Sequence, residues 1–144
     1  MADGAALSIA GLGVGAVLPE LVRGPITRGT LALFAGASHD HVLLHIDSDY
    51  AKAAGMDDVF GHGMLSMAYL AQAIRSWTPA ERLKTWSARF TAITPLNATV
   101  HCRGEVVEVF EDAGECRARL RIGAWTDAGL QTLDGEAVII IDRV

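Results

Sequence analysis

The clearest pattern in the sequence is an apolar run that begins at Met64. The segment MLSMAYLAQAIRS, residues 64–76, contains good helix formers and carries apolar residues on nearly every helical face until Arg75. A helix that is apolar most of the way round is expected to be buried rather than amphipathic. Trp77-Thr78-Pro79 follows, and a proline disfavours helical backbone at the residue before it. The pattern predicts a buried helix that the rest of the chain encloses.

After this helix the apolar positions change to a period of two, which is typical of strands. Residues 86–92 and 117–124 show this alternation, and residues 100–109, 137–141 and 17–22 supply further strand candidates. Glu111–Gly114 and Thr126–Gly129 have the composition of turns. A run of strands after a run of helices predicts an α+β fold, in which an antiparallel sheet lies against the central helix.

Two shorter helices are expected before the central one. Thr27 or Thr30 can cap a helix that ends around residues 36–38. Asp47 or Ser48 can cap a second, with Gly55 as its terminator. Between them lies SHDHVLLH, a short connection that holds three of the five histidines. Connections of this kind commonly hold catalytic groups.

The totals describe one compact domain, residues 1–144, with 51% hydrophobic content and a net charge of −5. Without a basic run, the sequence lacks the electrostatic pattern of a nucleic-acid-binding protein. The first 22 residues are apolar, but they contain no basic n-region and four glycines interrupt them, so neither a signal peptide nor a membrane helix is expected. We therefore expect a cytoplasmic protein that binds neither nucleic acid nor membrane.

Cys102 and Cys116 are the only cysteines, and both are interpreted as reduced packing residues. If they lie on a hairpin that turns near residues 112–114, Cys116 pairs near Val109 and Cys102 faces a residue near Gly123. The two thiols then do not oppose each other. Three tryptophans are expected in the core or at a dimer interface, namely Trp77, Trp86 and Trp125.

Asp40, His45 and Gly63 are the candidate catalytic residues. Asp40 and His45 lie five residues apart in one connection, so both side chains can project into one pocket. Gly63 follows His62 where the central helix begins, and a helix start offers unpaired N–H groups and partial positive charge. Glycine lets a ligand approach the backbone closely. A carboxylate, an imidazole and an oxyanion donor are sufficient for acid–base chemistry beside a carbonyl group.

A metal site is an alternative for this cluster, because Asp40, His39, His41 and His45 are all competent ligands. The spacing H-x-H-x-x-x-H matches none of the usual zinc arrangements, and no cysteine lies nearby. The spacing thus favours acid–base chemistry over metal binding.

Five polar residues also have a purely structural interpretation. Asp40 can be a cap or turn residue, and His62 a structural residue at the helix entrance. His41 is expected in an exposed loop, and His101 on a strand surface or in packing. Ser66, within an apolar helix, is expected to pack and to bond back to the backbone rather than to act as a nucleophile.

The stretch FAGASHDHVLLHIDSDYA, followed by VFGHGMLSM from Val59, resembles the MaoC-like hydratases. This family includes (R)-specific enoyl-CoA hydratases and (3R)-hydroxyacyl-thioester dehydratases. Its pattern is approximately aromatic-A-x-x-S-G-D-x-N-P-x-H-x-D, followed by an apolar-A-H-G-M-L helix start. The resemblance implies the hotdog fold, an antiparallel sheet wrapped around a long central helix. It also implies the addition of water to a trans-2-enoyl thioester, or the reverse dehydration.

The resemblance also implies roles for individual residues. Asp40 matches the catalytic aspartate, His45 the catalytic histidine, and Gly63 the glycine whose backbone N–H polarises the thioester carbonyl. His62, Gly63 and Met64 are expected to bind the substrate, an acyl thioester of CoA or of a carrier protein. No cofactor and no metal are expected, and the partner is expected to be a second copy of the chain or a related subunit.

Two departures from the family pattern keep other functions open. His39 replaces the family's glycine, and Val42-Leu43 replaces its Asn-Pro pair, although valine has no side-chain hydrogen bond to offer. The family's asparagine helps to orient the site through its side-chain amide. Here either His39 or His41 takes over that orientation, or the activity is altered. The alternatives are a hotdog thioesterase and a non-catalytic or partner-dependent subunit of a heteromeric dehydratase. Thioesterases of this fold usually carry their catalytic carboxylate on the central helix. The thioesterase is less favoured here, because the nearby acids, Asp57 and Asp58, precede that helix.

Overall fold

The computed structural model describes residues 11–143, in which short helices precede a run of strands. In chain order the elements are β1 (Leu21–Arg23), α1 (Arg28–Ser38), the 3₁₀ helix η1 (Leu43–His45), α2 (Ser48–Ala53), β2 (Phe60–Gly61), α3 (Gly63–Trp77), the 3₁₀ helix η2 (Ala80–Arg82), β3 (Leu83–Phe90), β4 (Thr94–Pro95), β5 (Val100–Asp112), β6 (Glu115–Thr126) and β7 (Gln131–Ile140).

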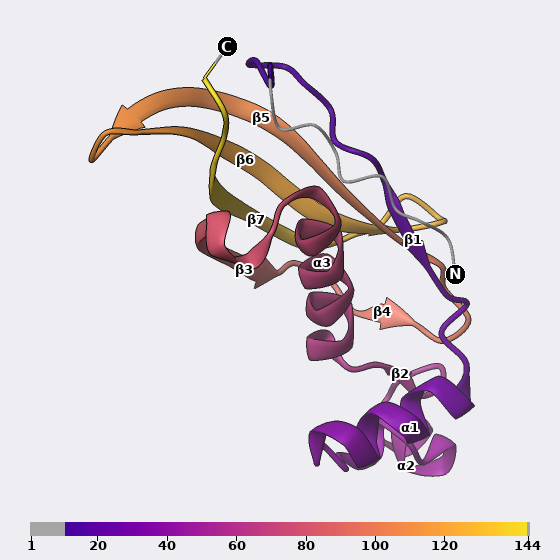
Figure 1. The fold of residues 1–144 in the computed structure, drawn as a ribbon. Helices are drawn as coiled ribbons and strands as arrows, with labels where there is room; N and C mark the ends of the chain where they lie inside the picture. Colours follow the sequence, from indigo (N-terminus) through magenta and orange to yellow (C-terminus); the bar gives the residue numbers. More distant parts are fainter. Residues whose placement is uncertain (1–10, 144) are drawn as a thin grey trace, which may run out of the picture.

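Five of the strands form one antiparallel sheet in the order β1-β5-β6-β7-β3. Helix α3 lies against one face of this curved sheet (Figure 1). The short strands β2 and β4 form a separate antiparallel pair beside the start of α3. The predicted α+β class, with an antiparallel sheet against the central helix, is confirmed.

Helix α3 supplies one side of the core. Its fully or nearly buried apolar residues meet the alternating inner residues of the long strands; they are Leu65, Leu70, Ala73, Ile74 and Trp77 from the helix and Val100, Val106, Leu120, Ile122 and Ile139 from the sheet. The Trp77 indole N–H donates to the Pro19 carbonyl at 2.8 Å, which ties the helix end to the segment before β1. The predicted helix, with its stop before Pro79, is therefore confirmed.

The two helices before α3 begin at the expected caps. The Thr27 hydroxyl accepts from the Thr30 N–H at 3.1 Å, and the Asp47 carboxylate accepts from the Tyr50 N–H at 3.0 Å. Figure 1 shows α1 and α2 together near the end of α3 at which that helix begins. The loop between α1 and α2 is thereby held next to the start of α3.

The register of the β5–β6 hairpin differs from the predicted one. Ala113 and Gly114, at φ 50° and 80°, make a two-residue turn, so Cys116 lies opposite Glu111 rather than near Val109. Cys102 lies opposite Ala124, because an irregularity between Val106 and Glu108 shifts the pairing. Both cysteines are free, as predicted. Burial raises the pKa of the Cys102 thiol to about 12, which makes it chemically inert.

The predicted strand at residues 17–22 is shorter than expected. Val17 makes only an isolated bridge to Glu105, and regular pairing begins at Leu21. Among the described residues, no helix has both the length and the apolar character needed to cross a bilayer.

We expect Gly104→Ala to destabilise the fold. A Cβ on this β5 residue would lie 2.8 Å from the Trp77 ring, and overpacking of this kind costs about 1–3 kcal/mol. The matched control is Gly36→Ala on α1, where a Cβ meets nothing within 4 Å and alanine should stabilise by about 0.5–1 kcal/mol. Urea unfolding followed by tryptophan fluorescence measures both free energies. Equal stability of the two variants would contradict the packing described for α3.

Candidate active site

The Asp40 carboxylate is positioned by the turn that ends α1. His39 adopts the left-handed conformation, at φ 58°, and stops the helix. Ser38 then accepts a hydrogen bond from the Asp40 N–H at 3.3 Å, and Asp40 Oδ1 accepts one from the Val42 N–H at 3.3 Å. The loop backbone therefore orients the carboxylate locally.

The His45 ring is fixed by Phe60. Its Nδ1 lies 2.8 Å from the Phe60 carbonyl oxygen, and the Phe60 ring meets it edge-on with centroids 4.9 Å apart. Because a carbonyl only accepts, Nδ1 carries the hydrogen in this contact. In the neutral ring, the lone pair of His45 is therefore on Nε2.

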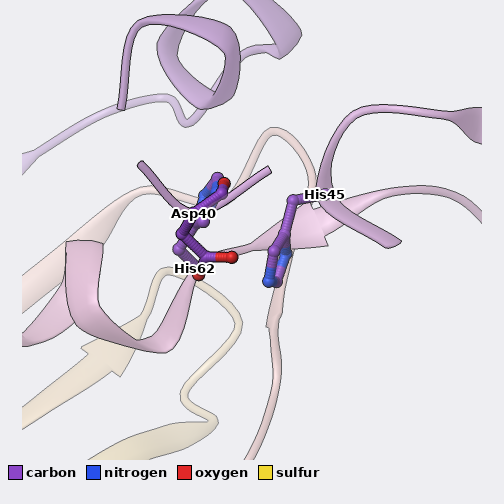
Figure 2. Close-up of side chains that lie close together, drawn as sticks. All are labelled: Asp40, His45 and His62. Carbon is purple, nitrogen blue, oxygen red and sulfur yellow. The ribbon is translucent and has the colours of Figure 1, made fainter. Parts of the chain in front are cut away.

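His62 joins the two candidate residues. It is fully buried, and its Nε2 donates to the Asp40 carbonyl oxygen at 3.1 Å. Its ring stacks on His45 with centroids 4.0 Å apart, and Phe34 contacts it edge-on at 5.0 Å. One polar atom from each of Asp40, His45 and His62 lies within 4.8 Å of the others, and the Asp40 carboxylate points toward the His45 ring (Figure 2).

Burial determines the protonation state of His62. Loss of solvation lowers its pKa; the hydrogen bond to the Asp40 carbonyl opposes this change, the nearby His45 adds to it, and the Asp40 charge opposes it. His62 is therefore a neutral donor at neutral pH, with its hydrogen on Nε2. Within the described residues, its Nδ1 is buried without a hydrogen-bond partner.

The start of α3 opens into a cavity of about 350 Å³. The Leu65 and Ser66 N–H groups bond to the His62 carbonyl, whereas the Gly63 N–H has no acceptor in the described part of the chain. Gly63 lines the cavity, and a Cβ there would lie 2.9 Å from the Phe90 ring. A larger residue at this helix start would therefore have to displace the Phe90 ring.

Asp40, His45 and His62 do not themselves line this cavity. Phe60 connects the two places, because it lines the cavity and its carbonyl holds His45. Met64 is half-exposed and also lies outside the lining. Of the three residues expected to bind substrate, only Gly63 reaches the cavity wall.

Asp40, His45 and His62 form the candidate ligand set for a metal, in place of the expected set with His39 and His41, which are both exposed. The ring planes of His45 and His62 meet at only 27°, with centroids 4.0 Å apart. Two such planes cannot both contain one ion at the roughly 2.0–2.1 Å bonding distance of imidazole nitrogen. The stacking therefore disfavours a metal centre.

Sequence reasoning missed two contacts of the site. The sequence indicates His62 only as a structural residue at the helix entrance or as a substrate contact, yet it bonds Asp40 and stacks on His45. Ser66 does not bond back to the backbone as expected; its hydroxyl pairs with that of Thr94 at 3.0 Å. Both partners are distant in sequence, so no local pattern reveals them.

The positions of Trp77, Trp86 and His101 are as expected, whereas Trp125 lies outside the core cluster. Trp77 is buried, and Trp86 packs partly buried against the core. Trp125 is half-buried and lies under the Arg103 guanidinium at 5.4 Å. His101 is half-buried on β5, 3.2 Å from the Glu20 carboxylate.

The family profile of the MaoC like domain matches residues 16–120. The chain belongs to the MaoC-like dehydratase family. Similar solved structures include the R-hydratase PhaJ1 from Pseudomonas aeruginosa, which is 30% identical with a TM-score of 0.81 over 96% of this chain and 88% of that one. No curated protein sequence gives a significant match.

Two further structures extend this comparison. The (R)-hydratase from A. caviae involved in PHA biosynthesis is 25% identical, with a TM-score of 0.78 over 92% of this chain and 98% of that one. A chain of the ChsH1-ChsH2 complex from Mycobacterium tuberculosis is 22% identical, with a TM-score of 0.74 over 90% and 98% of the two chains, and shows the fold alone. The hotdog fold implied by the sequence is thus confirmed for this MaoC-like domain.

The neutral state of His62 predicts a pH dependence of stability. Its pKa is lower in the folded chain than in the unfolded one, so below about pH 6.5 the unfolded state binds more protons and stability falls. His62→Gln keeps an N–H donor but cannot titrate. We expect the free energy of unfolding to fall more steeply between about pH 7 and pH 5 in the wild type than in this variant. Urea unfolding across this range is the measurement, and parallel curves would contradict a neutral buried His62.

Proposed function

We propose that the protein is an (R)-specific hydratase that adds water to trans-2-enoyl thioesters, or catalyses the reverse dehydration of (3R)-hydroxyacyl thioesters. The observation that carries the proposal is the convergence of Asp40 and His45, with His62 directly before an unpaired helix-start amide at Gly63. The similarity to two R-hydratases at 25–30% identity supports the same reaction class. Under this proposal the reaction uses acyl-CoA or acyl-carrier-protein and no cofactor.

Asp40, His45 and the Gly63 N–H have separate roles in adding OH and H to the same face of the double bond. A water between Asp40 and His45 donates one hydrogen bond to the carboxylate and one to His45 Nε2, which leaves an oxygen lone pair for the β-carbon. As that lone pair attacks, Asp40 takes the first hydrogen as a proton, and the second stays on the new hydroxyl group. As the C–O bond forms, charge moves to the thioester oxygen, where the Gly63 N–H and the helix dipole stabilise it. The proton taken by Asp40 then passes to the α-carbon, which balances the addition of one water.

Backbone groups orient Asp40 here, in place of the side-chain amide of the family's asparagine. Val42 contributes its N–H, rather than a side chain, to Asp40 Oδ1, and His62 holds the Asp40 carbonyl from the other side. The sequence suggested His39 or His41 for this orienting role, but both are exposed and neither fills it. The departure at Val42-Leu43 is therefore compatible with an oriented carboxylate.

The alternatives have less support. A hotdog thioesterase would place its carboxylate on α3, but Asp57 and Asp58 both lie before that helix, and Asp58 is engaged by Arg28 and Ser48. A partner-dependent subunit is favoured only by the Val42-Leu43 departure and by the fold shared with a heteromeric complex. For the partner we propose a second copy of the chain, paired along β3, one of the two edge strands of the sheet.

Incubation of the purified protein with crotonyl-CoA separates these functions. We expect the enoyl absorbance to fall without release of free thiol, because water adds to the double bond and leaves the thioester intact. A thiol reagent in a parallel reaction measures hydrolysis. Release of thiol would indicate a thioesterase, and no reaction at all would support the subunit alternative.

Asp40→Asn and His45→Ala should each lower the hydration rate by roughly a hundredfold or more, because the first removes the base and the second removes the group that orients the water. His41→Ala is the matched control, since His41 lies in the same loop but is exposed. Its rate should equal that of the wild type. Steady-state kinetics with crotonyl-CoA measures all three, and full activity in both site variants would overturn the assignment.

A further inference from the structure

Two buried hydroxyls in the cavity wall share one hydrogen bond, so one of their two hydrogens has no acceptor among the described residues. Ser66 Oγ and Thr94 Oγ1 lie 3.0 Å apart, with the residues only 1% and 3% exposed. Each hydroxyl carries one hydrogen, and only one hydrogen can lie between the two oxygens. Neither oxygen makes another hydrogen bond within the described residues. One O–H of the pair is therefore free to donate to a ligand.

The other hydroxyls of the same wall are already committed. Thr91 donates to the Gln131 carbonyl at 2.8 Å, and Thr132 donates to the Ala124 carbonyl at 3.3 Å. The neighbouring wall is apolar, with Phe60, Phe90 and Ile93. The Ser66–Thr94 pair is thus the side-chain donor that this wall presents to an acceptor oxygen.

The position of Ser66 indicates which ligand oxygen its hydroxyl would contact. Ser66 lies three residues after Gly63, so the two share one face of α3. Helical side chains point back toward the helix N-terminus, which directs the Ser66 hydroxyl toward the first turn and its unpaired Gly63 N–H. Both residues line the same cavity. Two donors, one from the backbone and one from a side chain, therefore face the same part of it.

We propose that the Ser66 hydroxyl is the second donor to the thioester oxygen and that Thr94 positions it. Thr94 donates to Ser66, and Ser66 donates into the cavity. The bond strengthens as negative charge develops on the oxygen during addition, so Ser66 acts mainly on the reaction rate. This inference rests on the proposed hydratase activity, and it makes Ser66 a catalytic residue and Thr94 a positioning residue.

Steady-state kinetics with crotonyl-CoA tests this assignment. Ser66→Ala should lower kcat by about tenfold or more with a much smaller change in KM, because the donor acts on the transition state. Thr94→Val should give a smaller loss, since it removes only the group that orients Ser66. Thr94→Ser keeps the hydroxyl and should restore most of the rate. Thermal unfolding of each variant shows whether the fold is intact, and if Ser66→Ala does not fold, the Thr94→Val and Thr94→Ser pair decides.

A second readout reports the carbonyl directly. In an Asp40→Asn background, which slows turnover, crotonyl-CoA labelled with ¹³C at the thioester carbonyl can be studied by infrared difference spectroscopy. Adding Ser66→Ala should raise the bound C=O stretching frequency, because one hydrogen bond to the oxygen is lost. A serine that only fills space would leave the frequency unchanged.

The outcomes separate this inference from the function on which it rests. If the wild type does not hydrate crotonyl-CoA, the proposed function fails and the role of Ser66 falls with it. If the wild type is active but Ser66→Ala has a kcat within about twofold of it and an unchanged carbonyl frequency, only the second donor is refuted. The hydratase function and the second donor are both supported if Ser66→Ala loses rate while Thr94→Ser does not, and if Ser66→Ala also raises the carbonyl frequency.

Discussion

The hydrogen bond from the buried His62 ring to the Asp40 carbonyl holds the site together. It joins residues 22 positions apart, and the same ring packs flat on His45. Burial keeps His62 uncharged, so it can support both neighbours without placing a positive charge beside His45. Because Gly63 follows directly, one short stretch of chain places the proposed acid–base pair and the amide proposed to receive charge.

Much of the fold could be predicted because its determinants are local. The apolar content of α3, the caps at Thr27 and Asp47, and the two-residue period of β6 each act within a few neighbouring positions. The register of the β5–β6 hairpin could not, because it depends on the tight turn at Ala113–Gly114 and on an irregularity beyond Val106. A shift of two positions at a turn displaces every pair along the hairpin.

The same distinction applies to the site. Asp40 and His45 could be predicted as neighbours because one short loop carries both. The contacts of His62 and the pairing of Ser66 with Thr94 span 22 and 28 residues, and only the folded chain brings them together. Val42 illustrates a second limit, because its side chain offers no hydrogen bond while its backbone N–H holds the carboxylate. Residue identity does not report backbone contributions of this kind.

The last residue of β3, Phe90, has a consequence for assembly. Its ring closes one wall of the cavity against Gly63, yet about half of it is exposed. Because β3 is one of the two edge strands of the sheet, its backbone is open to pairing with another strand. Under the proposed pairing of two copies along β3, the second copy would lie next to Phe90 and would help to define the shape of the cavity.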